Sequence, residues 1–249
     1  MAGTNRRPTP PAGAAGYAPM VTDEQAERIR QWHEKAYRAR KTATGGGQTI
    51  DYLGRKLVIP PEVMPITPVS HLLGGAVLAE VREHDRVLDM GTGSGVNAIL
   101  AASRATDVLA VDLNPDAVEA ARRNVERNGV ADRVEVRHSD VFSAVGGEFD
   151  LIVFDPPFRW FAPRDRTETA TTDENYRAMT EFFRTARRHL TPAGRMLIFF
   201  GTSGDLAYLK HLADEAGFRR EVVARHQQDN DGWPVRYFTF RMTPSAPPG

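Results

Sequence analysis

Short apolar runs alternate with longer helical stretches from Arg86 to the end of the chain. The apolar runs, which we expect to form strands, occupy residues 87–90, 108–111, 134–136, 151–154 and 196–200. The stretches with helical character occupy residues 94–104, 115–128, 174–190 and 205–216. This alternation predicts an α/β fold with a doubly wound, mostly parallel sheet.

Two further runs close the chain, at about residues 219–226 and 235–241, and they flank the turn Asp231-Gly232. A turn of this composition between two such runs is typical of an antiparallel pair. The sheet is therefore predicted to have seven strands, with an antiparallel strand at its C-terminal end.

The N-terminal part of the chain has a different character. Thr22 and Gln25 have the spacing of a capping box and predict a helix to about residue 41, and residues 50–59 predict a hairpin. Gly45-Gly46-Gly47 predicts a hinge between them, and a further helix is expected over residues 69–83. The predicted parts are a disordered tail (1–20), an appendage of helix and hairpin (21–64), the main domain (65–242) and a second disordered tail (243–249).

The composition excludes several classes of function. The 249 residues contain 32 basic and 32 acidic side chains, so no global field attracts the chain to nucleic acid. No cysteine is present, which excludes disulfides, zinc–cysteine clusters and thiol nucleophiles. The sequence shows no signal peptide, no membrane span and no metal-ligand cluster, so we expect a cytoplasmic protein without a metal site. It predicts no oligomeric state.

A glycine-rich sequence follows the first apolar run, with Gly91, Gly93 and Gly95 directly before a predicted helix. Glycines at this point permit a tight turn and close approach of the backbone to a ligand. Asp112 ends the next strand, where a carboxylate can accept both hydrogens of a ribose diol. Asp140 follows the third strand and can accept from the amino group of adenine. Together these residues predict a site for a nucleoside cofactor.

Two other interpretations of these residues exist. Any one of the acids is compatible with a helix N-cap, and only their convergence favours a ligand. A dinucleotide site has the pattern Gly-x-Gly-x-x-Gly, with the pyrophosphate at a helix N-terminus. Val96 stands where that pattern has its third glycine, so the spacing disfavours a nicotinamide cofactor.

Asp155-Pro156-Pro157-Phe158 directly follows the apolar run at residues 149–154. The two prolines end the strand ladder, because neither has an N–H to donate. The loop presents a carboxylate, carbonyl oxygens and a flat ring at the edge of the sheet where α/β proteins bind ligands. Such a set suits a planar NH2 group, whose hydrogens the oxygens accept and whose face the ring covers.

We therefore predict that Asp155 and Pro156 accept hydrogens from the target nitrogen and that Phe158 stacks on the acceptor. The residues that follow have loop character over 159–173 and are expected to form a lid. The acceptor pocket is predicted to be lined by Pro157, Phe158, Arg159 and Trp160.

The main domain resembles the class I S-adenosylmethionine-dependent methyltransferases over about residues 65–242. The first motif of that family matches residues 89–95, and its ribose-binding and adenine-contacting acids match Asp112 and Asp140. The resemblance implies a Rossmann-like fold and S-adenosylmethionine as the cofactor. The residues that it places against the cofactor are Asp89, Gly91, Thr92, Gly93, Gly95, Asp112, Leu113, Asp140, Val141 and Asp155.

The motif (Asp/Asn)-Pro-Pro-(Tyr/Phe) marks the amino-methylating members of that superfamily. The chain is similar in particular to the release-factor glutamine N5-methyltransferases, at residues 89–95, at Gly54 to Leu57 and at Pro65 to His71. A short segment stands where those enzymes have a large helical N-terminal domain. The implied reaction is in-line methyl transfer to a planar amide or amino nitrogen.

The acceptor stays open at this point. A protein glutamine, a small molecule and a nucleobase (adenine N6 or guanine N2) all present a suitable nitrogen. A different class of function is a binding module that holds S-adenosylmethionine without chemistry, although Asp155 to Phe158 disfavours it.

Overall fold

The computed structural model describes residues 17–42 and 47–245. Of the predicted disordered tails at 1–20 and 243–249, residues 1–16 and 246–249 lie outside the described residues, as do Gly45 and Gly46 of the predicted hinge. Residues 243 and 244 were predicted to be disordered but belong to the last strand, which ends at Pro244. The helices are α1 (Asp23–Thr42), α2 (His71–Glu80), α3 (Val96–Ala101), α4 (Pro115–Arg127), α5 (Arg177–Ala186) and α6 (Leu206–Glu215). The strands are β1 (Gln48–Tyr52), β2 (Arg55–Ile59), β3 (Arg86–Met90), β4 (Asp107–Asp112), β5 (Val134–His138), β6 (Phe149–Phe154), β7 (Leu190–Gly201), β8 (Phe218–Asn230) and β9 (Trp233–Pro244).

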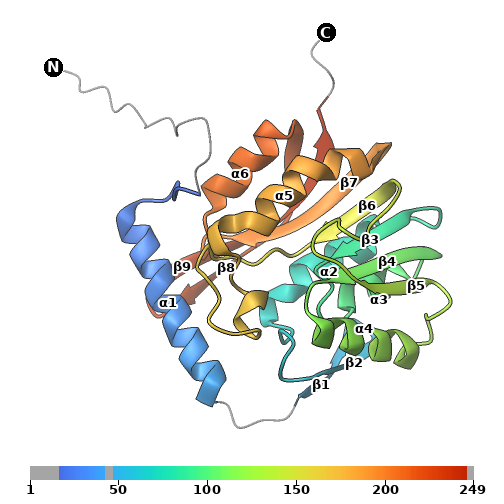
Figure 1. Cartoon of the computed structure of the whole chain (residues 1–249), viewed down its shortest axis with the longest axis horizontal. Coiled ribbons are helices and arrows are strands. Elements are labelled where there is room, and N and C mark those ends of the chain that lie inside the picture. The colour runs from blue at the N-terminus through green and yellow to red at the C-terminus, as the bar shows by residue number, and fades with distance from the viewer. Residues whose placement is uncertain (1–16, 43–46, 246–249) are drawn as a thin grey trace.

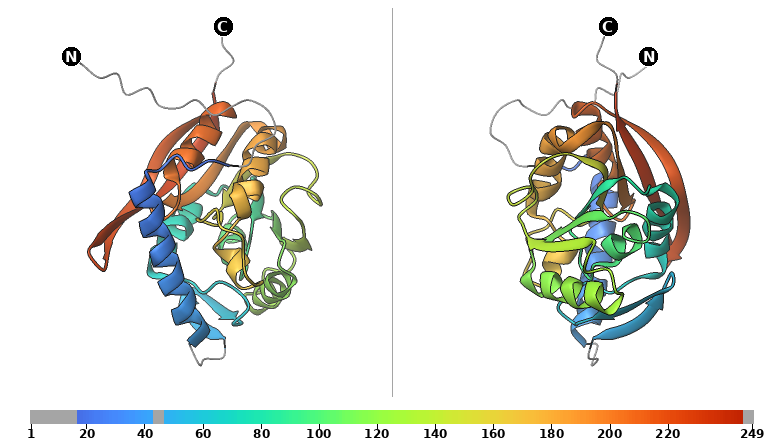
Figure 2. Two further views of the ribbon diagram at one scale, coloured as in Figure 1. Left: turned by 60° about the vertical axis from the view of Figure 1, so that its left-hand side comes forward. Right: turned by 90° about the vertical axis from the view of Figure 1, so that its right-hand side faces the viewer.

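Seven strands form one sheet in the order β5-β4-β3-β6-β7-β9-β8, and β1 and β2 form a separate hairpin. Strand β9 runs antiparallel to both of its neighbours, and the other pairs in the sheet are parallel. Helices α2 and α3 lie on one side of the sheet, and α5 and α6 lie on the other (Figures 1 and 2). The predicted fold class is confirmed.

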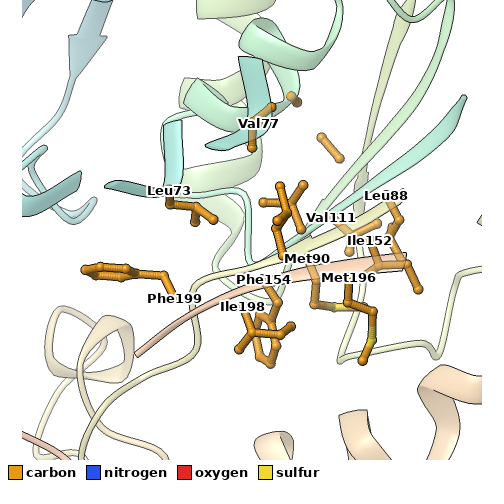
Figure 3. Packing of buried hydrophobic residues seen from close by; sticks show 14 of the residues in the cluster. Leu73, Val77, Leu88, Met90, Val111, Ile152, Phe154, Met196, Ile198 and Phe199 are labelled. Carbon is orange, nitrogen blue, oxygen red and sulfur yellow. The ribbon is translucent and has the colours of Figure 1, made fainter. Parts of the chain in front are cut away.

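The central strands are apolar along their whole length because helices cover both faces of the sheet. Strand β6 has side chains buried at every position except Asp150, which is half-buried. Figure 3 shows how α2 packs on these strands; the labelled residues are Leu73, Val77, Leu88, Met90, Val111, Ile152, Phe154, Met196, Ile198 and Phe199. Each fully buried side chain of this size contributes roughly 1.5–3 kcal/mol to the free energy of unfolding. This apolar layer therefore stabilises the strands from whose ends the loops emerge.

Several predicted elements differ from those observed at their ends. Helix α2 covers only part of the predicted 69–83, because Val81 is extended (φ −64°, ψ 136°). The predicted helix at 174–190 begins with a 3-10 turn at Glu174–Tyr176. Asn175 and Tyr176 have left-handed backbones (φ 55° and 51°) that no regular helix accommodates, so α5 starts only at Arg177. The closing strands are longer than predicted, and they meet at the predicted turn. Within the described part of the chain, every helix is too short or too polar to cross a lipid bilayer.

The hairpin is fixed to the main domain through Asn124 of α4, whose side chain is fully buried. Its Oδ1 accepts from the Val58 N–H (2.9 Å), and its Nδ2 donates to Val58 O (3.0 Å) and Ser94 O (2.9 Å). One amide thus joins β2, α4 and the glycine-rich loop. Asn128, one turn further along α4, makes similar contacts with the backbone of Lys56 at a more exposed position.

We expect Asn124→Ala to lower the free energy of unfolding by about 1–3 kcal/mol for each buried backbone group that loses its partner. Asn128→Ala is the matched control and should cost less, because water can replace the lost hydrogen bonds there. Urea unfolding followed by circular dichroism measures both variants. Equal losses would show that Asn124 does not carry the attachment.

Candidate active site

A cavity of about 780 Å³ opens at the carboxyl ends of the parallel strands β3, β4, β5 and β6. The loop after each of these strands contributes to its wall, as expected for a ligand site in a doubly wound sheet. The glycine-rich loop after β3 and the proline loop after β6 therefore face the same space.

The glycine-rich loop is shaped by left-handed backbones at Gly91 (φ 65°), Gly93 (φ 55°) and Gly95 (φ 84°). A Cβ at Gly95 would lie 3.1 Å from the backbone of Ala121, so this glycine lets the start of α3 pack against α4. A Cβ at Gly93 would meet nothing within 4 Å. Gly91, Thr92 and Gly93 line the cavity, whereas Gly95 does not.

Asp89 binds residues of this loop and of the helix after it through hydrogen bonds, and it does not line the cavity. Its carboxylate is 1% exposed and accepts from Thr92 Oγ1 (2.5 Å) and the Ala98 N–H (3.0 Å). Burial raises the pKa of Asp89 to about 7, although both hydrogen bonds favour the ionised form. The structure thus places Asp89 behind the predicted cofactor site and not in contact with it.

Asp112 lies at the end of β4, half-buried, with its carboxylate beside the glycine-rich loop. One oxygen accepts from the Gly93 N–H (2.9 Å) and the other from the Asn114 N–H (2.8 Å). Each carboxylate oxygen has a second acceptor site, so the side chain is fixed in direction and can still bind a diol. Burial raises the pKa of Asp112. Leu113 is exposed beside it and also lines the cavity.

Asp140 and Val141 line the next part of the wall, after β5. Asp140 forms an ion pair with Arg177 at 2.9 Å, and the Ser139 hydroxyl donates to Val141 O (2.7 Å). Val141 has a left-handed backbone (φ 47°), which is strained for a β-branched residue. Strain of this kind is common in loops that bind ligands.

Asp155 points into the cavity and accepts no hydrogen bond from any described residue. The residue is exposed to the open cavity, between the buried residues Phe154 and Pro156. Burial, with a smaller contribution from the charge of Asp89, raises the pKa of Asp155 to about 7. Pro156 and Pro157 line the cavity beside it. This carboxylate is therefore available to a ligand.

Phe158 forms part of the cavity wall, and its ring packs on Phe200 with the centroids 4.5 Å apart. Its carbonyl accepts from the Tyr176 hydroxyl at 2.5 Å. A Cβ at Gly204 would lie 2.1 Å from the same carbonyl oxygen, so only glycine fits at that position. These contacts fix the proline loop against the segment between β7 and α6.

The two residues after Phe158 point in different directions. Arg159 lines the cavity, as predicted, whereas Trp160 does not. The Trp160 ring packs instead against Tyr17 (5.5 Å between centroids) and Tyr176 (6.0 Å). The structure therefore does not bring Trp160 together with the other predicted acceptor residues.

Among the further lining residues that sequence reasoning did not identify are Trp32 of α1, Ser203 after β7 and Tyr237 of β9. They come from elements far apart in the chain, and none lies in a local motif. The only sequence signal for any of them was Trp32 itself, a single tryptophan in the otherwise polar helix α1. Helix α1 reaches the site because His33 contacts Glu168 of the lid segment at 2.7 Å, with both side chains buried.

The residues present fit a nucleoside cofactor. Two carboxylates, Asp112 and Asp140, follow adjacent strands, and the glycine-rich loop lies open to the cavity beside the first of them. Within residues 17–42 and 47–245, no group of three or more His, Asp or Glu side chains is placed to hold a metal ion.

The fold and the cavity are those of a class I S-adenosylmethionine-dependent methyltransferase. Residues 70–228 match the family model for the methyltransferase small domain, and the chain belongs to this family.

Its relatives include enzymes that act on proteins. The release factor glutamine methyltransferase of Cereibacter sphaeroides is 32% identical over 206 residues, covering 76% of this chain and 73% of that one. The ribosomal protein uL3 glutamine methyltransferase of Bradyrhizobium diazoefficiens is 29% identical over 198 residues, covering 73% of this chain and 60% of that one. The ribosomal protein L11 methyltransferase of Exiguobacterium is 48% identical, but the match spans only 34% of this chain and 28% of that one.

Solved structures show the same fold. The ribosomal protein L11 methylase from Lactobacillus delbrueckii superposes with a TM-score of 0.56 at 20% identity, covering 80% of this chain and all of that one (100%). A tRNA methyltransferase from M. jannaschii superposes with a TM-score of 0.60 at 16% identity, covering 82% of this chain and 59% of that one.

The raised pKa of Asp155 predicts a dependence of stability on pH. Between the unfolded value of about 3.9 and the folded value of about 7, the folded chain binds more protons than the unfolded chain. The amide of the Asp155→Asn variant does not titrate. The free energy of unfolding of the wild-type chain minus that of this variant should therefore fall as the pH rises through this interval, and then level off. Urea unfolding without ligand at about pH 5, 6, 7 and 8 measures this difference. Parallel stability curves for the two proteins would contradict the shift.

Proposed function

We propose that the protein transfers a methyl group from S-adenosylmethionine to a planar amide or amino nitrogen. One observation carries the proposal: the glycine-rich loop and Asp155 to Phe158 line a single cavity, in which the Asp155 carboxylate has no partner among the described residues. A cofactor held by the first loop thus lies within reach of an acceptor held by the second.

The cofactor end of the cavity has three parts. Asp112 would accept hydrogens from the ribose diol, because its position is fixed by the Gly93 and Asn114 amides. Asp140 and the backbone of Val141 would contact the adenine. The residues proposed to surround the rest of the cofactor are Gly91, Thr92, Gly93 and Leu113. Bound there, S-adenosylmethionine supplies an electrophilic methyl carbon.

The proline loop would position the nucleophile. The Asp155 carboxylate and the Pro156 carbonyl accept the two hydrogens of the NH2 group, which turns the nitrogen lone pair toward the methyl carbon. Phe158 covers one face of the acceptor. Placement of two reacting groups in this way can lower the barrier by roughly 7–11 kcal/mol.

Asp155 has a second task in this proposal. As the N–C bond forms and the S–C bond breaks, positive charge develops on the nitrogen, and a carboxylate in a site with little water stabilises it. The nitrogen then releases a proton. A carboxylate with a pKa of about 7 is suited to accept that proton at neutral pH.

A protein glutamine and a small molecule are both acceptors of this kind. The glutamine methyltransferases among the relatives support the first. A nucleobase gains no support from the cavity, because its cationic lining residues in the described part of the chain are limited to Arg159 and Arg177. Release of S-adenosylhomocysteine with candidate acceptors tests the proposal, and binding of the cofactor without any turnover would favour a non-catalytic module.

We expect Asp112→Ala to weaken binding of S-adenosylmethionine by about 1.5–3 kcal/mol, from the loss of charge-assisted hydrogen bonds to the ribose. Asp107→Ala is the matched control, because Asp107 is exposed at the opposite end of the same strand. Isothermal titration calorimetry measures both. Unchanged affinity in Asp112→Ala would remove the ribose role.

We expect Asp155→Asn to reduce turnover roughly 100-fold or more, because an amide neither carries the charge nor accepts two hydrogens equally well. Affinity for S-adenosylhomocysteine should stay within a few-fold of wild type. The measurement is formation of S-adenosylhomocysteine with a glutamine-containing peptide and with small planar amines. Wild-type turnover in Asp155→Asn would exclude the proposed mechanism.

A further inference from the structure

Arg159 is a buried cation without an acidic partner among the described residues. Its side chain lines the acceptor end of the cavity, and the residue is only 6% exposed. Its Nε has no hydrogen-bond partner among the described residues, and none of the ion pairs between those residues includes it. Burial lowers the pKa of Arg159 to about 10, so the guanidinium is still charged at neutral pH. A buried charge of this kind is costly unless something pairs with it.

The acids near Arg159 are already engaged. Glu168 binds His33 and Arg164, and Asp173 accepts from the amides of Ala178 and Met179. Among the described residues, the side chains of Arg159 and Asp155 form neither an ion pair nor a hydrogen bond with each other. The chain itself supplies no counter-charge in its described part.

A second donor that has no partner among the described residues lies in the wall of the same cavity. Ser203 Oγ is buried, lines the same cavity and has no hydrogen-bond partner among the described residues. Its neighbour Gly204 packs directly against the Phe158 carbonyl, which brings this loop next to Arg159. The guanidinium lies over the Trp32 ring, 4.6 Å from its centroid. Stacking covers one face of the guanidinium and leaves the N–H groups at its edge for a ligand in the plane.

We propose that Arg159 and Ser203 bind a carboxylate group of the methyl acceptor, at the opposite end of that molecule from the nitrogen held by Asp155. This inference rests on the proposed function for the position of the nitrogen. A single guanidinium matches the charge and the bidentate geometry of a carboxylate. A phosphate dianion would leave excess negative charge, because Arg177, the other cation of the wall, is paired with Asp140.

A carboxylate-binding site at this position restricts the class of methyl acceptor. An internal glutamine residue of a protein carries no carboxylate next to its amide, whereas a small amino or amido acid does. Trp32 lies against Arg159 and bounds this end of the cavity, where a polypeptide would have to continue. The acceptor is therefore a small carboxylic acid with a planar amine or amide.

The test uses the full chain saturated with S-adenosylhomocysteine and two probes of equal size, 4-aminobenzoate and 4-aminobenzamide. Calorimetry should show that the carboxylate probe binds roughly tenfold more tightly or better than its neutral amide. Arg159→Met should abolish that preference and Ser203→Ala should reduce it. The matched control is Arg166→Met, since Arg166 is an exposed arginine of the same segment and does not line the cavity.

Folding provides an independent readout. Ser203 Oγ has no hydrogen bond to lose among the described residues, so Ser203→Ala should melt at the same temperature as the wild-type chain or above it. Arg159→Met removes an unpaired buried charge but also the contact with the Trp32 ring, so its melting temperature should change little. A purely structural arginine would instead give a lower melting temperature.

Three outcomes overturn the proposal: equal binding of the two probes, binding of neither, or tighter binding of 4-aminophenyl phosphate than of 4-aminobenzoate. Failure of S-adenosylhomocysteine to bind would count against the proposed function alone, because the probes can then be compared on the protein without it. Unchanged affinity for S-adenosylhomocysteine in Arg159→Met would show that the cofactor end is intact.

Discussion

The parallel register of three neighbouring strands is the constraint on which the site depends. Met90 pairs with Val111 on one side and with Phe154 on the other. The next residues of the three chain segments, Gly91, Asp112 and Asp155, therefore lie side by side at this edge of the sheet, with adjacent strands about 4.8 Å apart. A slip of one residue would turn these side chains to the opposite face of the sheet. The apolar layer between sheet and helices excludes such a slip, so core packing and site geometry have the same cause.

This arrangement gathers three carboxylates at one edge of the sheet, and their surroundings differ. Asp89 and Asp112 each accept hydrogen bonds from backbone amides that offset part of the cost of burial. Asp155 receives none from the described residues, and its pKa is raised by burial and by the charge of Asp89. A group that lowers stability in the free protein and is still accessible to a ligand is better explained by function than by folding. Arg159 meets the same description with the opposite charge.

The sequence predicts those parts of the site that lie in continuous segments. Apolar runs and glycine or proline loops are local signals, so the strands themselves and the residues after β3 to β6 follow from them. The cavity is lined by Trp32 and not by the predicted Trp160, and no local sequence signal accounts for this difference. The backbone of Arg159 pairs with that of Thr172, which directs Trp160 into the cluster around Tyr176. Which tryptophan reaches the cavity depends on how α1 packs across the domain, and no periodicity in the sequence contains that information.

The two ends of the cavity differ in their relation to the family. The loops that would hold the cofactor all lie within residues 70–228, the part of the chain that matches the family model. Trp32 and Tyr237, which line the acceptor end, lie before and after that part. Membership of the family therefore accounts for methyl transfer but carries no information about these two walls of the acceptor pocket. Arg159 and Ser203 lie within the matched part, but the wall that Trp32 and Tyr237 complete around them does not, so the acceptor is inferred from the lining of the cavity rather than from the names of the relatives.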